Sequence, residues 1–438
     1  MKAILEKIPG YSVFGKMVST ATFRHSTITF AGTFANGVFG AIFYILAARF
    51  LGPAAFGLLS VALAVLTLTS DIGDLGTDTG LVNFVARNFD NDETKAKRFL
   101  KLGFEIKIAV WLVILGFGIA TSSFWAEVVF RKPELTQPIK IAFVGMGAML
   151  MFSFILHTLQ ALQKFWSWSI IQAGTNALRV IMVLALLGFG YLNLNSTIWL
   201  YIAMPTLGFV IGLYLIPRGF LKVRGEKKIA REFFHYNKWV AAFTLMAALS
   251  SRLDTFISAR LLDAAQVGLY SAAIQMVKIV PQLVTALGTV IAPKMAQIGS
   301  IEDLVRYLKK TQVLVFFLAI LGVMAIPVVL YLIPFLFGSE YTASGPIFAV
   351  LLFAMLFFLI SVPVHMSIFY YFSYPKLFFW LSIVHLTIIA GLGWVLVSRY
   401  GAIGAATSVL VAQVVGFIVP ALWVIRQITR RRLRKATT

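Results

Sequence analysis

The amino-acid sequence predicts an all-α integral membrane protein with about twelve transmembrane helices. Of its 438 residues, 60% are hydrophobic and only 13% are charged, whereas about a quarter of the residues of a soluble domain are charged. The hydrophobic residues form continuous runs, of roughly 18 residues or more, which is the length of an α-helix that crosses a bilayer. They do not alternate as the strands of a membrane β-barrel do. The predicted spans are 26–48, 56–76, 102–124, 139–160, 169–192, 196–217, 238–260, 265–292, 313–335, 346–370, 377–397 and 401–425.

The start of the chain does not have the pattern of a secretory signal peptide. Charged and polar residues are spread through residues 1–24, and no short apolar core with a small-residue cleavage site follows them. The first long apolar run is the span 26–48. The second span, 56–76, is the least regular, because Asp71 and Asp74 fall inside it and the segment DIGDLGTDTG contains three glycines.

Basic residues lie almost entirely on one side of the predicted membrane. An even number of spans puts both termini on the same side, which carries 28 Lys and Arg against five on the other. Because Lys and Arg collect in cytoplasmic loops, we expect a plasma-membrane protein with both termini in the cytoplasm. The net charge of +21 is then explained by loops that contact anionic membrane lipids, and not by binding to nucleic acid.

An internal repeat divides the chain near its midpoint. Residues 48–62, ARFLGPAAFGLLSVA, align without a gap with residues 259–273, ARLLDAAQVGLYSAA, at an offset of 211, and eight of the fifteen positions are identical. Since each half contains an even number of spans, the repeat predicts two parallel six-helix lobes. The expected domains are an N-terminal lobe at 1–217, a cytoplasmic linker at 218–237, a C-terminal lobe at 238–425 and a basic cytoplasmic tail at 426–438.

The repeat also carries a resemblance to a known family. ARFLGPAAFGLLSVA followed by DIGDLG resembles the first-to-second-helix region of Wzx-type polysaccharide flippases, within the multidrug/oligosaccharidyl-lipid/polysaccharide exporter superfamily. RLDTFISARLLDAAQVGLYSAA followed by VIAPKMAQI resembles the matching region of the second half. The resemblance implies two lobes around a central cavity and alternating access. It also implies that a lipid-linked oligosaccharide is moved from the cytoplasmic to the outer leaflet for cell-surface polysaccharide biosynthesis.

Cations inside the predicted spans are candidates for binding the cargo. Charges at membrane depth are costly, and they usually face protein or a water-filled interior. Arg179, Arg252 and Lys278 fall within spans five, seven and eight. A lipid-linked saccharide carries phosphate or pyrophosphate, which Arg recognises with its planar fork and Lys with a point charge. These three residues are therefore the candidate cargo-phosphate contacts.

Acidic residues inside the spans are candidates for ion coupling or for pairing with those cations. These candidates are Asp71, Asp74 and Asp254. Asp78 follows Asp74 by four residues, so Asp71, Asp74 and Asp78 share one face if the helix is continuous. The alternative is that the helix breaks at the glycines near residue 70, which would leave the acids close to the cytoplasmic rim. Asp254 is two residues from Arg252, so these two do not form a simple pair on one face.

Uncharged polar residues in spans one, four and five are candidates for sugar contacts. They are Asn36, Gln160, Gln172 and Asn176. Gln172, Asn176 and Arg179 recur at helical spacing and so share a face. The alternative is that these groups form hydrogen bonds between helices. His157 lies near them, but no second histidine or acid has the spacing of a metal site, and no metal is expected.

The sequence favours a carrier over an enzyme. It has no G-x-x-x-x-G-K-[ST] motif and no loop that would hold a nucleotide-binding domain, so no cofactor is expected and transport is driven by an ion gradient, the membrane potential or consumption of the cargo. Two alternatives stay open: an ion-coupled exporter of small amphipathic compounds, and a membrane polymerase or glycosyltransferase that acts on lipid-linked sugars. The expected partners are a lipid-linked oligosaccharide of the polyprenyl phosphate or pyrophosphate type, membrane lipids and a polysaccharide polymerase, and we expect a monomer.

Overall fold

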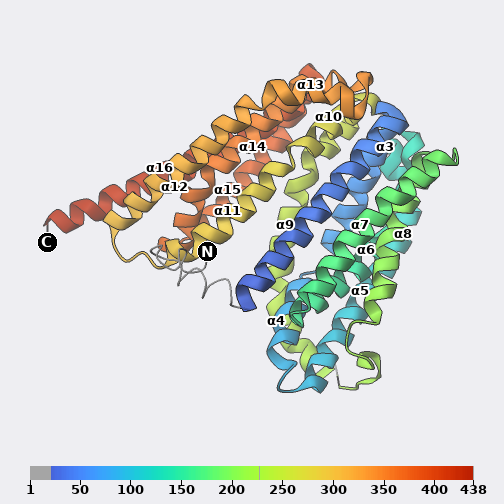
Figure 1. Cartoon of the computed structure of the whole chain (residues 1–438), viewed down its shortest axis with the longest axis horizontal. Coiled ribbons are helices and arrows are strands. Elements are labelled where there is room, and N and C mark those ends of the chain that lie inside the picture. Colours follow the sequence, from blue (N-terminus) through green and yellow to red (C-terminus); the bar gives the residue numbers. More distant parts are fainter. Residues whose placement is uncertain (1–20, 226, 438) are drawn as a thin grey trace, which may run out of the picture. The chain divides into compact units, whose positions relative to one another are not determined.

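A computed structural model describes residues 21–225 and 227–437. These residues form helices joined by short turns, and none of them is in a strand (Figure 1). The predicted all-α class is confirmed. The cytoplasmic placement expected for the N-terminal segment falls on residues 1–20, which lie outside the described residues.

The number of spans agrees with the prediction once two helix breaks are considered. Among the described residues, ten helical segments are long and apolar enough to cross a membrane. Two of the ten are broken by a glycine with positive φ. Gly52 interrupts α3 (Ala21–Gly73) at φ 77, and Gly401 interrupts α16 (Gly393–Thr437) at φ 63. Such a φ ends a regular helix and is readily adopted only by glycine. Counting both sides of each break gives twelve spans.

The second predicted span ends in a turn. Helix α3 stops at Gly73, and α4 (Thr77–Asn88) starts after Leu75 and Gly76, which have φ 49 and 73. The helix break, one of the two alternatives that the sequence left open at these glycines, is therefore the observed structure. Farther along the chain, α9 (Lys227–Leu261) begins within the predicted linker 218–237. The domain bounds drawn from the sequence stay a prediction.

The first compact unit consists of the described residues among 1–43, 65–122 and 139–245. Its core contains three aromatic rings from different helices. Phe84 of α4 stacks on Phe99 at a centroid distance of 4.6 Å, and Phe233 of α9 lies 5.9 Å from both rings. Burying each such side chain contributes about 1.5–3 kcal/mol. Besides parts of α3 and α9, the unit's helices are α4, α5 (Glu93–Ser123), α6 (Thr136–Ala161), α7 (Phe165–Gly188), α8 (Leu194–Leu213) and the short η3 (Phe220–Lys222).

The second unit consists of the described residues among 44–64, 123–138 and 246–438. Helix α14 (Ser344–Met366) packs against α10, α11, α12 and α16. Its sequence is apolar on every side, as expected for a helix surrounded by other helices. The remaining elements are η1 (Phe124–Val129), η2 (Pro133–Leu135), α10 (Ala264–Val277), α11 (Ile279–Ala296), α12 (Ile301–Met324), α13 (Ile326–Phe337), η4 (Ser339–Tyr341), η5 (Ser367–Tyr371), α15 (Lys376–Thr387) and η6 (Ile388–Leu392).

Within this second unit the two copies of the repeat pack against each other. A Cβ atom added at Gly57 would lie 1.9 Å from the carbonyl oxygen of Ala264, and one added at Gly268 would lie 1.9 Å from the carbonyl oxygen of Pro53. The offset of 211 makes Gly268 the counterpart of Gly57 and Ala264 the counterpart of Pro53. The contact is therefore reciprocal, as at an interface with two-fold symmetry. Only glycine allows the two backbones to approach this closely.

The arginine of each copy binds the end of another helix. Arg49 Nη1 donates hydrogen bonds to the carbonyls of Phe335 and Leu336 in the last turn of α13. Arg260, its counterpart, donates from Nη1 to the carbonyls of residues 128 and 129 at the end of η1. A cation at a helix C-terminus satisfies carbonyls that have no partner within the helix. The repeat therefore conserves a contact as well as a sequence.

The residue before each of these arginines also accepts a hydrogen bond from a side chain outside the repeat. The carbonyl of Ala48 accepts a hydrogen bond from the Tyr341 hydroxyl at 2.9 Å, and the carbonyl of Ala259 accepts one from Lys132 Nζ. Lys132 also donates to the Leu262 carbonyl at 2.6 Å. Burial lowers the pKa of the Lys132 ammonium. One side chain from outside the repeat thus secures each copy, a neutral donor in one case and a cationic donor in the other.

Candidate functional site

The turn between α3 and α4 fixes two carboxylates at a helix start. The Asp74 carboxylate accepts a hydrogen bond from the Thr77 hydroxyl at 2.7 Å and one from the Asp78 amide at 3.1 Å. The first amides of a helix have no carbonyl partner within it, and a side-chain oxygen commonly takes that role. Asp74 is thereby held in position, and Asp78 is the second residue of α4.

Lys107 of α5 joins these two carboxylates. Its Nζ lies 2.6 Å from Asp74 Oδ1 and 3.0 Å from Asp78 Oδ1, and its side chain is completely buried. The Ser153 hydroxyl donates to Asp78, and His157 Nδ1 lies 3.2 Å from Asp78 Oδ1. With both carboxylates ionised and Lys107 charged, the network has one net negative charge while His157 is neutral. It can therefore take up one positive charge without becoming positive.

A second polar network surrounds Arg179 of α7. Its guanidinium lies 4.1 Å from the ring centroid of Tyr201 and 5.4 Å from that of Phe43. Aromatic faces attract a desolvated cation. Arg179 Nη1 donates to Asn176 Oδ1 at 2.6 Å, and Asn176 Nδ2 donates to Asn36 Oδ1. The guanidinium is thus positioned by two rings and an amide, although only about 6% of the residue is exposed.

Both networks line one cavity of the first unit, with a volume of about 300 Å³. This volume is at the lower end of the range for sites that bind small molecules. Gln172 also lines the cavity, and its buried Oε1 accepts no hydrogen bond from any described residue. The cavity therefore presents a guanidinium, an amide oxygen and carboxylates to the same space. Its charged and amide side chains are Asn36, Asp71, Asp74, Asp78, Gln172, Asn176 and Arg179.

Most of the residues predicted for the first half of the chain meet at this cavity. The exception is Gln160, which is exposed and does not line it. The prediction that Asp71, Asp74 and Asp78 share one face of a continuous helix is wrong, because the chain turns between Asp74 and Asp78. Asp74 and Asp78 nevertheless converge, and they do so on Lys107 and not on an arginine.

The remaining predicted residues lie in the second unit. The Asp254 carboxylate accepts a hydrogen bond from the Tyr270 hydroxyl at 2.6 Å. Arg252 Nε is buried and donates to no described residue. Lys278 Nζ lies 5.1 Å from the ring centroid of Tyr44, and it is close enough to Arg252 for their charges to repel. Arg252 thus lies within electrostatic range of both Lys278 and Asp254.

Lys107, Ser153 and Tyr201 are members of the site that the sequence reasoning missed. The sequence did indicate a role for Lys107, because a lone lysine inside an apolar span needs an acidic partner. It did not indicate which acid is that partner, since Asp74 is 33 residues away in the sequence. Ser153 and Tyr201 had no signal, since hydroxyl and aromatic residues are common throughout the spans.

A comparison of the sequence with protein families gives one match over most of the chain. Residues 23–299 match the family of polysaccharide biosynthesis proteins. The chain belongs to this family. No curated protein matches the sequence.

Solved structures with the same fold are membrane transporters. A lipid II flippase, MurJ, in an inward closed conformation has a TM-score of 0.74 at 14% identity, over 92% of this chain and 89% of that one. An inward-facing multidrug resistance MATE family transporter of the MOP superfamily has a TM-score of 0.68 at 13% identity, over 92% and 96%. A MOP superfamily transporter from Pyrococcus furiosus, described as having a binding pocket of reversed polarity, has a TM-score of 0.54 at 11% identity, over 92% and 93%. This chain therefore has the fold of these transporters.

Proposed function

We propose that this protein is a flippase that moves an anionic lipid-linked oligosaccharide from the cytoplasmic to the outer leaflet by alternating access. Membership in the polysaccharide biosynthesis family and the fold of a lipid II flippase support this role. The observation that carries the proposal is Arg179, a buried guanidinium that lines a cavity also lined by three amide side chains. A planar guanidinium recognises phosphate well, and phosphate is the anion that a lipid-linked saccharide always carries.

The contacts of the Arg179 guanidinium support a phosphate-binding role. Its Nη1 is engaged by Asn176 at 2.6 Å, and the rings of Tyr201 and Phe43 hold the plane of the guanidinium. A planar fork held in this way loses little further side-chain entropy when it binds phosphate. Asn36, Gln172 and Asn176 then contact sugar hydroxyls, and the buried Oε1 of Gln172 accepts one of them.

Arg252 and Lys278 provide a second phosphate contact in this proposal. Their charges repel each other, and Arg252 Nε has no acceptor among the described residues. A dianionic group such as a pyrophosphate relieves the repulsion and supplies the acceptor. Asp254 has a different role, because its carboxylate is engaged by the Tyr270 hydroxyl and attracts Arg252, so it acts as the charge partner that Arg252 leaves when cargo arrives.

The acidic network supplies the coupling. Lys107 bridges Asp74 and Asp78, so both act chiefly as charge partners. Asp71 lines the same cavity and His157 lies 3.2 Å from Asp78, and in this proposal these two groups take up the positive charge that resets the empty carrier. Moving one positive charge inward along the membrane potential releases about 2.3 kcal/mol per 100 mV. In this proposal a plasma-membrane monomer, with both termini in the cytoplasm, delivers its cargo to a polysaccharide polymerase.

One observation favours a second candidate, an ion-coupled exporter of small amphipathic cations. Three carboxylates line the same cavity as Arg179, and carboxylates attract cationic compounds. The MATE fold is compatible with this candidate. The two functions differ in the charge of the cargo, which makes them experimentally separable.

Deleting the gene and analysing lipid-linked saccharides in each leaflet tests the proposal. The flippase predicts that completed lipid-linked units accumulate on the cytoplasmic leaflet, and that Arg179→Ala causes the same accumulation as the deletion. Units that reach the outer leaflet but stay unpolymerised would instead indicate an enzyme. Normal lipid-linked saccharides together with raised sensitivity to cationic drugs would indicate the exporter.

A further inference from the structure

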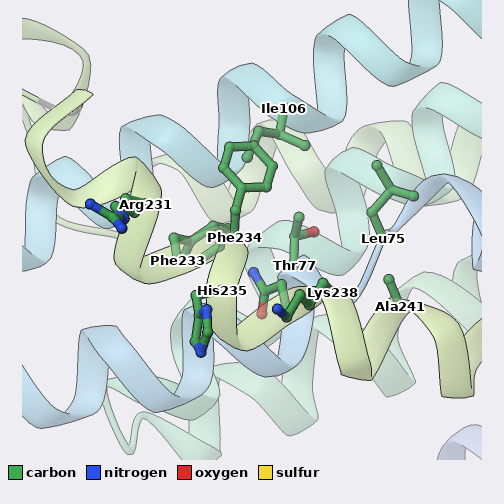
Figure 2. A pocket seen from close by; sticks show the side chains of 10 residues that line it. Leu75, Thr77, Ile106, Arg231, Phe233, Phe234, His235, Lys238 and Ala241 are labelled. Atoms are coloured by element: carbon green, nitrogen blue, oxygen red, sulfur yellow. The ribbon is translucent and has the colours of Figure 1, made fainter.

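A second cavity of the first unit, of about 460 Å³, lies between the helix break and the start of α9 (Figure 2). Its wall is mostly apolar and is formed by Leu75, Ile106, Phe234 and their neighbours. Figure 2 shows Phe234 pointing from α9 toward Ile106, with Leu75 beside Thr77. None of the described residues that line this cavity lines the cavity of Arg179. It is therefore a separate place in the unit with its own chemistry.

Asn237 gives this cavity an unusual polar group. The residue is only 3% exposed, and neither its Nδ2 nor its Oδ1 has a hydrogen-bond partner among the described residues. A Cβ atom added at Gly80 would lie 2.5 Å from Oδ1, so the amide is packed tightly against that glycine. Buried polar groups are nearly always hydrogen-bonded. The amide therefore fits a ligand that offers both an acceptor for Nδ2 and a donor for Oδ1.

Three basic residues complete the lining. Arg231, His235 and Lys238 are exposed residues of α9, and their spacing of four and three places them along one side of the helix. Figure 2 shows them arising from successive turns of α9. None of the described residues that line the cavity is acidic. The charge of the lining is therefore complementary to an anion, while its apolar wall is complementary to a hydrocarbon chain.

We propose that this cavity binds a membrane phospholipid whose headgroup carries both an anionic phosphate and a hydroxyl group. Arg231 and Lys238 contact the phosphate, Asn237 Nδ2 donates to a phosphate or ester oxygen, and Asn237 Oδ1 accepts from the hydroxyl. The acyl chain covers Leu75, Ile106 and Phe234. A lipid is the occupant, and not a soluble phosphate ester, because the wall is mostly apolar and a soluble ester would leave that surface exposed to water. The proposal does not depend on the cargo carried past Arg179.

The test measures lipid binding to the purified full chain in detergent by native mass spectrometry and by thermal unfolding. The probes are phosphatidylglycerol, phosphatidylmethanol, which has the same charge but no hydroxyl, phosphatidylcholine, and glycerol 3-phosphate as a soluble ester. We expect phosphatidylglycerol to bind about fivefold more tightly than phosphatidylmethanol, the effect of one hydrogen bond. Phosphatidylcholine and glycerol 3-phosphate should bind more weakly than either.

Variants connect the binding to the cavity. Arg231→Gln combined with Lys238→Gln should weaken phosphatidylglycerol binding about tenfold. The matched control is Arg218→Gln with Lys222→Gln, two exposed cations of the preceding connection that do not line the cavity, and it should bind as the original chain does. Asn237→Leu keeps the size of the side chain without its buried polar atoms, so it should fold and bind phosphatidylglycerol and phosphatidylmethanol equally.

Three results would overturn the assignment. Equal binding of phosphatidylglycerol and phosphatidylmethanol by the original chain would remove the role of Asn237. Glycerol 3-phosphate binding as tightly as phosphatidylglycerol would show a soluble anion site. An equal loss of phosphatidylglycerol affinity in the cavity variant and in the control variant would show that the lipid is attracted by surface charge only. None of these results bears on lipid-linked saccharide transport, so failure here is distinguishable from failure of the flippase proposal.

Discussion

Gly57 and Gly268 occupy the same position in the two copies of the internal repeat, and each faces a backbone carbonyl of the other copy. A Cβ atom on either would come within 1.9 Å of that oxygen. A contact this close cannot be accommodated by a side-chain movement, because the neighbouring atom belongs to the backbone. The two helices that begin at 53 and 264 can approach in this way only if both positions lack a side chain.

Adding a methyl group at either glycine should therefore destabilise the protein. We expect Gly57→Ala and Gly268→Ala each to cost about 1–3 kcal/mol, as overpacking of a filled interior does. Thermal unfolding of the purified protein in detergent measures this loss. Gly174→Ala is the control, because nothing lies within 4 Å of a Cβ there and alanine favours the helix. If Gly57→Ala behaved as Gly174→Ala does, the close packing of the repeats would be incorrect.

The arginines of the repeat should contribute equally to stability. Arg49→Gln and Arg260→Gln each remove a cation from two terminal carbonyls, so we expect a loss of about 1 kcal/mol for each. Arg399→Gln is a suitable control, since Arg399 is exposed and has no hydrogen bond among those described for the chain. Unfolding in detergent at low and high salt is the measurement. A loss as large in Arg399→Gln would assign the effect to general surface charge.

Removing Lys107 should be more damaging than removing any surface cation. Lys107→Met leaves the half-buried carboxylates of Asp74 and Asp78 together without their fully buried bridge, and breaking a buried ion pair costs about 3–5 kcal/mol. Adding Asp78→Asn to Lys107→Met should recover part of this loss, because only one carboxylate then lacks its partner. The free energy of unfolding of the three chains decides the point. If Lys107→Met were as stable as the original chain, the ion pair would not stabilise the fold.

Arg179 should matter for transport through its shape as well as its charge. We expect Arg179→Ala to lower the transport rate of a lipid-linked saccharide in proteoliposomes by at least about tenfold. The transport rate of Arg179→Lys should lie between those of the original chain and Arg179→Ala. Lysine keeps the charge but not the planar guanidinium, which lies 4.1 Å from the ring centroid of Tyr201. Gln160→Ala is the control, since Gln160 does not line the cavity. Transport by Arg179→Ala at the original rate would exclude Arg179 as a cargo contact.

Part of the site was predictable because helical periodicity is local. The spacing of Gln172, Asn176 and Arg179 follows from 3.6 residues per turn, and the structure places all three at one cavity. The bridge from Lys107 to Asp74 is different, because 33 residues separate them and several acids in the spans were equally eligible partners. Which acid meets which cation depends on how α5 is rotated against the turn after α3. Hydropathy does not encode that rotation.

The sequence by itself determined the all-α class, the number of spans and the repeat, since apolar run length and self-similarity are properties of the chain alone. It also left open a helix break at the glycines of DIGDLGTDTG, and the structure has that break. Only the tertiary structure decided that the repeats meet at Gly57 and Gly268, and that the buried amide of Asn237 has no hydrogen-bond partner among the described residues. Those outcomes depend on contacts between helices distant in sequence, and such contacts are set by the packing of side-chain shapes, which no local pattern records.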